Sequence, residues 1–140
     1  MPQTSPQRPG TMRLTDAVMY RLPLAGVVSI LHRVSGLLMF ALLPFVIWLF
    51  DNSLGSEISY DTFTSAFVAG IGVVPAWMVK LVVLALIWAF LHHAIAGVRH
   101  LWMDMTHSVR KEQGRSSALI TLASSLVLTA LLGAKLFGIY

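Results

Sequence analysis

The chain has 140 residues, of which 56% are hydrophobic and only 11% are charged, and its formal net charge at pH 7 is +4. This composition excludes a soluble domain of this length and indicates one membrane-embedded domain over residues 1–140. The absence of cysteine excludes disulfides, zinc–thiolate sites and iron–sulfur clusters held by this chain, and the small positive charge indicates orientation in a lipid membrane rather than nucleic-acid binding.

The first 24 residues are expected to form a polar arm. Residues 1–11 are rich in Pro, Gln and Arg and lack the short apolar core of a signal peptide, so no cleaved signal peptide is expected. A short amphipathic helix is expected over Asp16–Leu22, with Thr15 as its N-cap. Pro23 can open the next helix, because its ring presets the φ angle of a first helical turn.

Three apolar stretches are each long enough to cross the ~30 Å hydrocarbon core of a bilayer. The first is expected over residues 25–50, with a kink at Pro44 that a membrane helix tolerates. The second is expected over residues 67–103, with its main helix starting at Pro75, and the third over residues 117–138. The predicted fold is therefore an all-α membrane protein with three transmembrane helices preceded by the short amphipathic segment.

The two connections between these spans differ in charge. A polar loop expected over Asp51–Thr64 holds three acidic residues and no basic one, whereas a short connection over Thr106–Ser116 is rich in Arg and Lys. Eight of the ten basic residues fall on the side of the amino terminus and the second connection. Because basic residues are retained on the cytoplasmic side, we expect a cytoplasmic amino terminus and a periplasmic carboxyl terminus in a bacterial inner membrane.

Ionisable side chains in the second span mark a candidate functional site, because such groups are costly in lipid. His93, Gly97, His100 and Asp104 follow one another at helical spacing and share one face. His92 lies about 100° round the same helix, so His92 and His93 cannot both face one iron atom. We therefore interpret His92 as a packing residue and His93 as a candidate haem ligand, with Gly97 making room beside it.

A second polar face lies on the first span. Ser29, His32, Arg33 and Gly36 occupy positions i, i+3, i+4 and i+7 of a helix. Arg33 and His93 each lie about eight residues inside their spans, or about 12 Å at 1.5 Å per residue, so the two polar faces are expected to meet at one depth. A cation at that depth needs an anionic partner, and a haem propionate would serve.

These residues carry a family resemblance. The sequence from Ser29 to Gly36 resembles the S-x-x-H-R-x-[ST]-G motif of the cytochrome b subunit of succinate dehydrogenase, and the segment from His93 to Asp104 is similar to that family's H-x-x-x-G-[LIVMT]-R-[HF]-x-x-x-D motif. Arg8-Pro9 and Arg21-Leu22-Pro23 resemble its amino-terminal arm. The three-span plan agrees, so the resemblance covers nearly the whole chain.

The resemblance implies a place in respiratory complex II, an enzyme of electron transport and the tricarboxylic acid cycle. A flavoprotein subunit oxidises succinate, an iron–sulfur subunit relays the electrons, and two membrane-anchor subunits bind haem b between them and help form the ubiquinone site. This chain would be one of the two anchors, an electron-transfer subunit with no residue that acts on succinate. The second haem ligand would come from the sister anchor.

Residue roles follow from the matching motif positions. His93 would be the axial ligand of the haem iron, with His100 as a weaker candidate for haem contact. Ser29 and Arg33 would bind the quinone, through a hydroxyl and a positive charge, and His32 and Arg33 lie where the haem propionates are expected. Arg99, near the span boundary, is expected to reach lipid headgroups or a propionate.

Two alternatives to a succinate:ubiquinone oxidoreductase remain at this point. One is the anchor of a quinol:fumarate reductase, which runs the same chemistry in reverse. The other is a small membrane protein without haem, in which the buried His and Arg side chains form a proton relay.

Overall fold

The computed structural model describes residues 20–107 and 110–139, and these form a helical protein. Its helices are α2 (Leu24–Ala41), α3 (Leu43–Leu54), α4 (Glu57–Val68), α5 (Ala76–Thr106) and α6 (Lys111–Leu136). Helices α2, α5 and α6 are long and apolar enough to cross a membrane, which confirms the predicted class of fold. Thr15 and most of the helix expected over Asp16–Leu22 lie outside the described residues.

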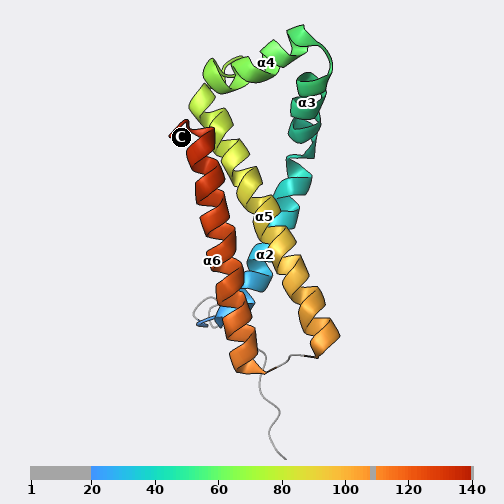
Figure 1. Cartoon of the computed structure of the whole chain (residues 1–140), viewed down its shortest axis with the longest axis vertical. Coiled ribbons are helices and arrows are strands. Elements are labelled where there is room, and N and C mark those ends of the chain that lie inside the picture. Colours follow the sequence, from blue (N-terminus) through green and yellow to red (C-terminus); the bar gives the residue numbers. More distant parts are fainter. Residues whose placement is uncertain (1–19, 108–109, 140) are drawn as a thin grey trace, which may run out of the picture.

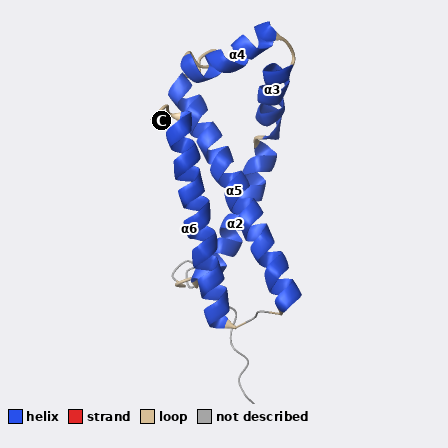
Figure 2. Ribbon diagram, in the orientation of Figure 1, coloured by secondary structure: helices blue, strands red, loops and turns tan. Residues whose placement is uncertain are grey.

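The helices are arranged as a tall bundle whose chain turns round at each end (Figure 1). Helices α2 and α3 rise as one bent path, α4 crosses the top, and α5 descends across α2 to the opposite end. Helix α6 then returns beside α5 and ends near the start of α5 (Figure 2). The start of α2, the end of α5 and the start of α6 therefore lie at the same end of the bundle.

The first apolar span is broken in two. Helix α2 stops at Ala41, Leu42 leaves the helical conformation with φ −93° and ψ 5°, and α3 begins at Leu43. Pro44, in the first turn of α3, has no N–H to donate, and its ring clashes with the carbonyl one turn earlier in a continuous helix. The kink predicted at Pro44 is thus present, and it divides the first span into the two helices α2 and α3.

The polar loop expected over Asp51–Thr64 is a wrong prediction, because most of that stretch is helical. The hydroxyl of Ser56 accepts a hydrogen bond from the backbone N–H of Ser59 at 3.2 Å, and the N–H of Ser56 donates to the hydroxyl of Ser59 at 2.7 Å. This reciprocal capping box starts α4. Three aromatic rings then contact one another along one side of the helix, Phe63 lying tilted against Tyr60 and edge-on to Phe67.

The main helix of the second span begins where the sequence predicts. Pro75 is the N-cap of α5, and the helix continues for 31 residues to Thr106, three residues beyond the expected end. His107 ends it in the left-handed conformation, with φ 52°. Helix α6 begins at Lys111, so the charged connection expected over Thr106–Ser116 is partly helical.

Small residues allow the three spanning helices to pack closely. Val28 of α2, Ala96 of α5 and Ala118 of α6 are fully buried and contact one another where the helices cross. In lipid, helices associate through close van der Waals packing rather than through the hydrophobic effect, so short side chains at a crossing are stabilising. This crossing fixes how α5 is rotated against α2 and α6.

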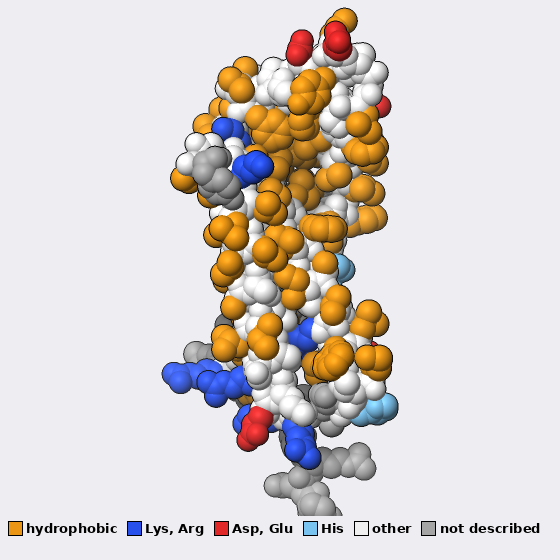
Figure 3. All heavy atoms as spheres, in the orientation of Figure 1, with side chains coloured by type: hydrophobic (Ala, Val, Ile, Leu, Met, Phe, Trp, Pro, Cys, Tyr) orange, Lys and Arg blue, Asp and Glu red, His pale blue; other side chains and the backbone are white. Residues whose placement is uncertain are grey.

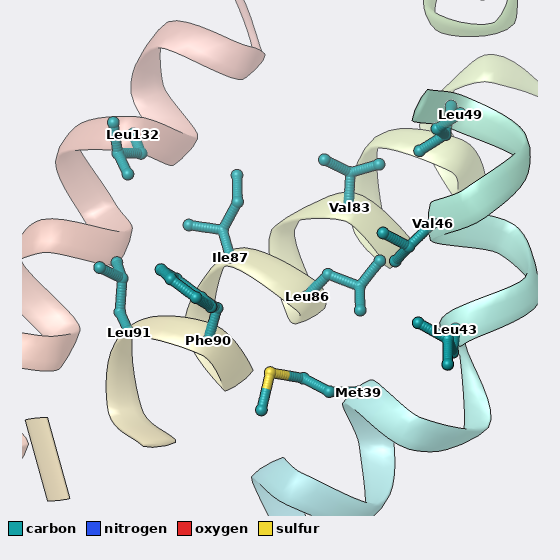
Figure 4. Close-up of a pocket in the computed structure, with 10 residues that line it drawn as sticks. All are labelled: Met39, Leu43, Val46, Leu49, Val83, Leu86, Ile87, Phe90, Leu91 and Leu132. Carbon is teal, nitrogen blue, oxygen red and sulfur yellow. The ribbon is translucent and has the colours of Figure 1, made fainter. Parts of the chain in front are cut away.

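The half of the bundle beyond Leu42 is more open. Among the described residues, α3 packs against α2 and α4 but has no backbone contact with α5. A cavity of about 530 Å³ separates α3 from α5, with Leu43, Val46, Leu86 and Phe90 in its walls (Figure 4). Its walls hold no ionisable side chain, so the candidate site lies elsewhere.

The helix crossing can be tested by enlarging one small side chain. Ala96→Leu should lower the unfolding free energy by about 1–3 kcal/mol, because the added carbons meet α2 and α6 at a fully packed position. Ala94→Leu is the matched control, since Ala94 is exposed two residues earlier on α5. The thermal unfolding midpoint of the purified protein in detergent measures both, and equal shifts would contradict the proposed crossing.

Candidate functional site

Helix α5 presents polar side chains in two directions. His93 faces α2, whereas His92 and Arg99 face α6. The adjacent histidines therefore contact different helices, as the helical spacing predicts. Ala96, which is buried where the helices cross, lies about one turn from His92 and His93. Its packing fixes the rotation of α5 and therefore the directions in which the two histidines point.

His93 is anchored to the backbone of α2. Its Nδ1 lies 3.0 Å from the carbonyl oxygen of His32 and 3.3 Å from the hydroxyl oxygen of Ser35. The Ser35 hydroxyl itself donates to the His32 carbonyl at 2.8 Å. Because a carbonyl can only accept, the geometry favours the His93 tautomer with its proton on Nδ1.

That tautomer leaves a lone pair on the other ring nitrogen. Nε2 of His93 forms no hydrogen bond with any residue in ranges 20–107 and 110–139. A metal-ligating histidine usually donates its second N–H to a carbonyl, which fixes the ring and raises the basicity of the ligating nitrogen. His93 has this arrangement before any metal is present, so a haem iron fits it.

Gly36 provides the space for the His93 ring. A Cβ atom added at Gly36 would lie 3.0 Å from Cε1 and 3.3 Å from Nδ1 of His93, closer than ordinary packing permits. At Gly97 the nearest atom to such a Cβ is Nε2 of His32 at 3.8 Å, an ordinary contact. The glycine opposite the His93 ring is therefore Gly36. Gly97 faces His32, and its predicted role in the close approach of a helix or porphyrin stays a prediction.

Three imidazole rings form a column between α2 and α5. The His32 ring stacks on His93 with centroids 4.1 Å apart, and the His100 ring lies tilted against His32 with centroids 5.2 Å apart. All three side chains are half-buried. The predicted meeting of the two polar faces therefore occurs through these histidines.

The remaining predicted site residues lie on α2 without partners inside the chain. Ser29 is half-buried and Arg33 is exposed, and neither forms a hydrogen bond or ion pair with another described residue. The residue that the sequence analysis missed is Ser35, which is fully buried and contacts His93. Its signal was present in the motif, where a Ser or Thr precedes the glycine.

His92 is a packing residue, as expected. It is fully buried, its Nδ1 lies 3.2 Å from the hydroxyl of Ser125 on α6, and its ring stacks on Trp88. Its Nε2 is buried without a hydrogen-bond partner. The imidazole thus joins α5 to α6, on the side of α5 away from the histidine column.

The column does not form a chelating site for a free metal ion. In the part of the chain that the structure describes, no three His, Asp or Glu side chains gather as metal ligands. The chain instead provides one oriented imidazole, that of His93, which lies beside the buried Ser35 and in the space left by Gly36. Such a single ligand suits a metal already held by a planar macrocycle.

Comparison with known proteins points to one family. The model of the succinate dehydrogenase/fumarate reductase transmembrane subunit matches residues 5–132. The chain is 31% identical over 112 residues to the succinate dehydrogenase cytochrome b556 subunit of Paracoccus denitrificans, covering 80% of this chain and 81% of the relative. It is 29% identical over 127 residues to the subunit of the same name from Coxiella burnetii, covering 91% and 94%.

The role of Gly36 can be tested against Gly97. Gly36→Ala should displace the His93 ring and lower the unfolding free energy by about 1–3 kcal/mol, because the added methyl meets the ring at 3.0 Å. Gly97→Ala should be neutral or slightly stabilising, because its methyl has room and alanine favours the helix. Thermal unfolding of the two variants measures the difference, and a larger loss for Gly97→Ala would overturn this account.

Proposed function

The chain belongs to the succinate dehydrogenase/fumarate reductase transmembrane subunit family and is a membrane anchor of that enzyme complex, and on this premise we propose that it binds haem b and ubiquinone. The reaction would be succinate:ubiquinone oxidoreduction, with electrons passing from an iron–sulfur subunit to quinone. A flavoprotein subunit would supply them. The observation that carries this proposal is the orientation of His93, with Nδ1 on the His32 carbonyl and Nε2 free.

His93 would be the axial ligand that this chain contributes to the haem. The haem supplies one-electron redox chemistry when it is bound. The chain's own part is to hold the imidazole in one tautomer, through the carbonyl at 3.0 Å, and to leave space for it at Gly36. His32 and Arg33, and more weakly His100, are the candidates for contact with the propionates.

A second membrane subunit would supply the opposite axial ligand. The rings of His32 and His93 lie side by side, with 23° between their planes. Opposite axial ligands point at an iron atom from its two sides, which side-by-side rings cannot do. His32 is therefore unsuited to complete the coordination, and the haem would lie between two chains.

Ser29 and Arg33 would form part of the quinone site. They lie one turn apart on α2, where the described residues leave Ser29 half-buried and Arg33 exposed. The hydroxyl of Ser29 can donate to a quinone carbonyl, and the guanidinium of Arg33 can stabilise the negative charge that develops on the ring oxygens during reduction. Both effects are strong where water is excluded.

Charge placement supports a cytoplasmic amino terminus in a bacterial inner membrane. Arg110, Lys111 and Arg115 at the start of α6 lie at the end of the bundle where α2 begins. Most of the blue side chains gather at this end in Figure 3, whereas Lys80 near the start of α5 and Lys135 near the end of α6 belong to the other end. The acidic side chains of the α3–α4 region also lie at that other end, and Glu112 lies at the basic end. The iron–sulfur and flavoprotein subunits would dock at the basic end, near the histidine column.

The haem assignment predicts a spectral loss. His93→Ala should abolish the b-type band in the reduced-minus-oxidised spectrum of the purified complex, because among the described histidines His93 alone has its Nδ1 on a backbone carbonyl. His92 also has an unbonded Nε2, but its ring is fully buried and bonds to α6. His100→Ala is the matched control, since it removes an imidazole from the same column without removing the ligand. An unchanged band in His93→Ala would refute the assignment.

The quinone assignment predicts a separation of two activities. Ser29→Ala and Arg33→Leu should each reduce quinone reduction by about ten-fold or more, the effect of losing one hydrogen bond or charge in a buried site. Oxidation of succinate with an artificial dye should remain, because that step takes place in another subunit. Unchanged quinone reduction in both variants would refute the assignment, whereas equal loss of both activities would indicate failed assembly.

A further inference from the structure

Arg99 is a buried cation outside the histidine column. Only 8% of its surface is exposed, and it points to α6 rather than to α2. Its Nε donates to the hydroxyl of Ser117 at 3.0 Å, and Nη2 donates to the carbonyl of Gly114 at 3.3 Å. A guanidinium has five N–H donors, so three remain for another ligand.

The charge of Arg99 is not compensated by any of the described residues. Its partners are a hydroxyl and a carbonyl, and in residues 20–107 and 110–139 no carboxylate forms an ion pair with it. A charge this deeply buried is costly unless an opposite charge accompanies it. The ligand missing from Arg99 is therefore an anion.

A polar cavity opens beside this side chain. It has a volume of about 260 Å³ and lies on the seam between α5 and α6, lined by Trp102, Met103, Gln113, Ser116, Ser117 and Ile120. Ser117 also accepts the bond from Nε of Arg99. Trp102 and Met103 follow Arg99 by three and four residues, on the same face of α5. Arg99 does not itself line the cavity, and Ser117 is the lining residue that bonds to it, so an anion in the cavity would lie near the guanidinium.

The surroundings of the cavity match those of a lipid headgroup. Gly114 and Ser117 lie three and six residues into α6, or about 5–9 Å from its first residue. Trp102 is 57% exposed, as an indole at a membrane interface is expected to be. Leu101, Leu119 and Ile120 beside the seam are exposed apolar side chains. The polar side chains at the opening of the cavity suit a phosphate group, and the exposed apolar side chains beside the seam suit acyl chains.

We propose that the α5–α6 seam binds one anionic phospholipid, whose phosphate pairs with Arg99. The guanidinium matches phosphate geometry with two parallel N–H donors. Gln113 and Ser116 at the mouth offer polar groups to the headgroup, and the exposed leucine and isoleucine side chains contact an acyl chain. The exposed cations at the start of α6, Arg110, Lys111 and Arg115, raise the local concentration of anionic lipid.

The test compares lipids on the intact, delipidated complex. Its thermal unfolding midpoint should rise with phosphatidylglycerol, less with phosphatidylcholine, and not with inorganic phosphate, which lacks acyl chains. Arg99→Gln should weaken the phosphatidylglycerol effect roughly ten-fold in lipid concentration, the cost of losing a charge-assisted pair. Mass spectrometry of retained lipid should show phosphatidylglycerol depleted in the same variant.

Two further variants make the test decisive. Lys135→Gln removes a positive charge from an exposed position in the last turn of α6, at the other end of the bundle, and should retain the lipid effect. Ser116→Phe fills the mouth of the cavity from an exposed position, leaves the bonds of Arg99 in place, and should lose the effect even if Arg99→Gln fails to assemble. Equal stabilisation by both lipids, or full lipid retention in Ser116→Phe, would overturn the proposal. Loss of a neighbouring subunit from Arg99→Gln with normal lipid in Ser116→Phe would identify a protein carboxylate as the partner instead.

Discussion

A polar group inside a membrane must find its partner within protein, and this constraint organises the bundle. Helix α5 carries its polar side chains toward two different helices. His93 bonds to a carbonyl of α2, while His92 and Arg99 bond to α6. Each bond ties α5 to a neighbour, so the helix cannot rotate without losing several of them at once. The direction of one imidazole is therefore a property of the three-helix crossing.

Close packing makes those bonds possible. Where α2, α5 and α6 cross, the buried side chains are valine or alanine, and beside His93 the opposing residue is glycine. Larger side chains would hold the backbones apart, and an imidazole would no longer reach the His32 carbonyl. The buried polar residues of α6, Thr121 and Ser125, also have small side chains. The small residues at the crossing thus allow the helices to approach closely enough for the polar contacts to form.

The sequence predicted the three spans, the start of α5 at Pro75, and the divergence of the two adjacent histidines. These follow from apolar length, proline chemistry and helical spacing, which are local. It missed α4, because polar composition outweighed the Ser56–Ser59 capping box as a signal. It assigned no role beside His93 to Gly36 or Ser35, both of which lie against that imidazole. Both contacts depend on which residues of α2 lie opposite His93 where the two helices cross. The periodicity of each helix predicts which residues share a face, but it does not predict how two helices are aligned along their axes.

The interruption at Leu42 gives the bundle unequal stiffness along the membrane normal. On one side of it three helices interlock. On the other side, α3 contacts only α2 and α4 among the described residues and faces α5 across a cavity. A bilayer that is thicker or thinner than the protein imposes a strain of fractions of a kcal/mol per Å, and we expect the less tightly packed half to respond to it first, by a change in the tilt of α3. The histidine column lies on the tightly packed side of Leu42, so we expect it to be less affected by membrane thickness.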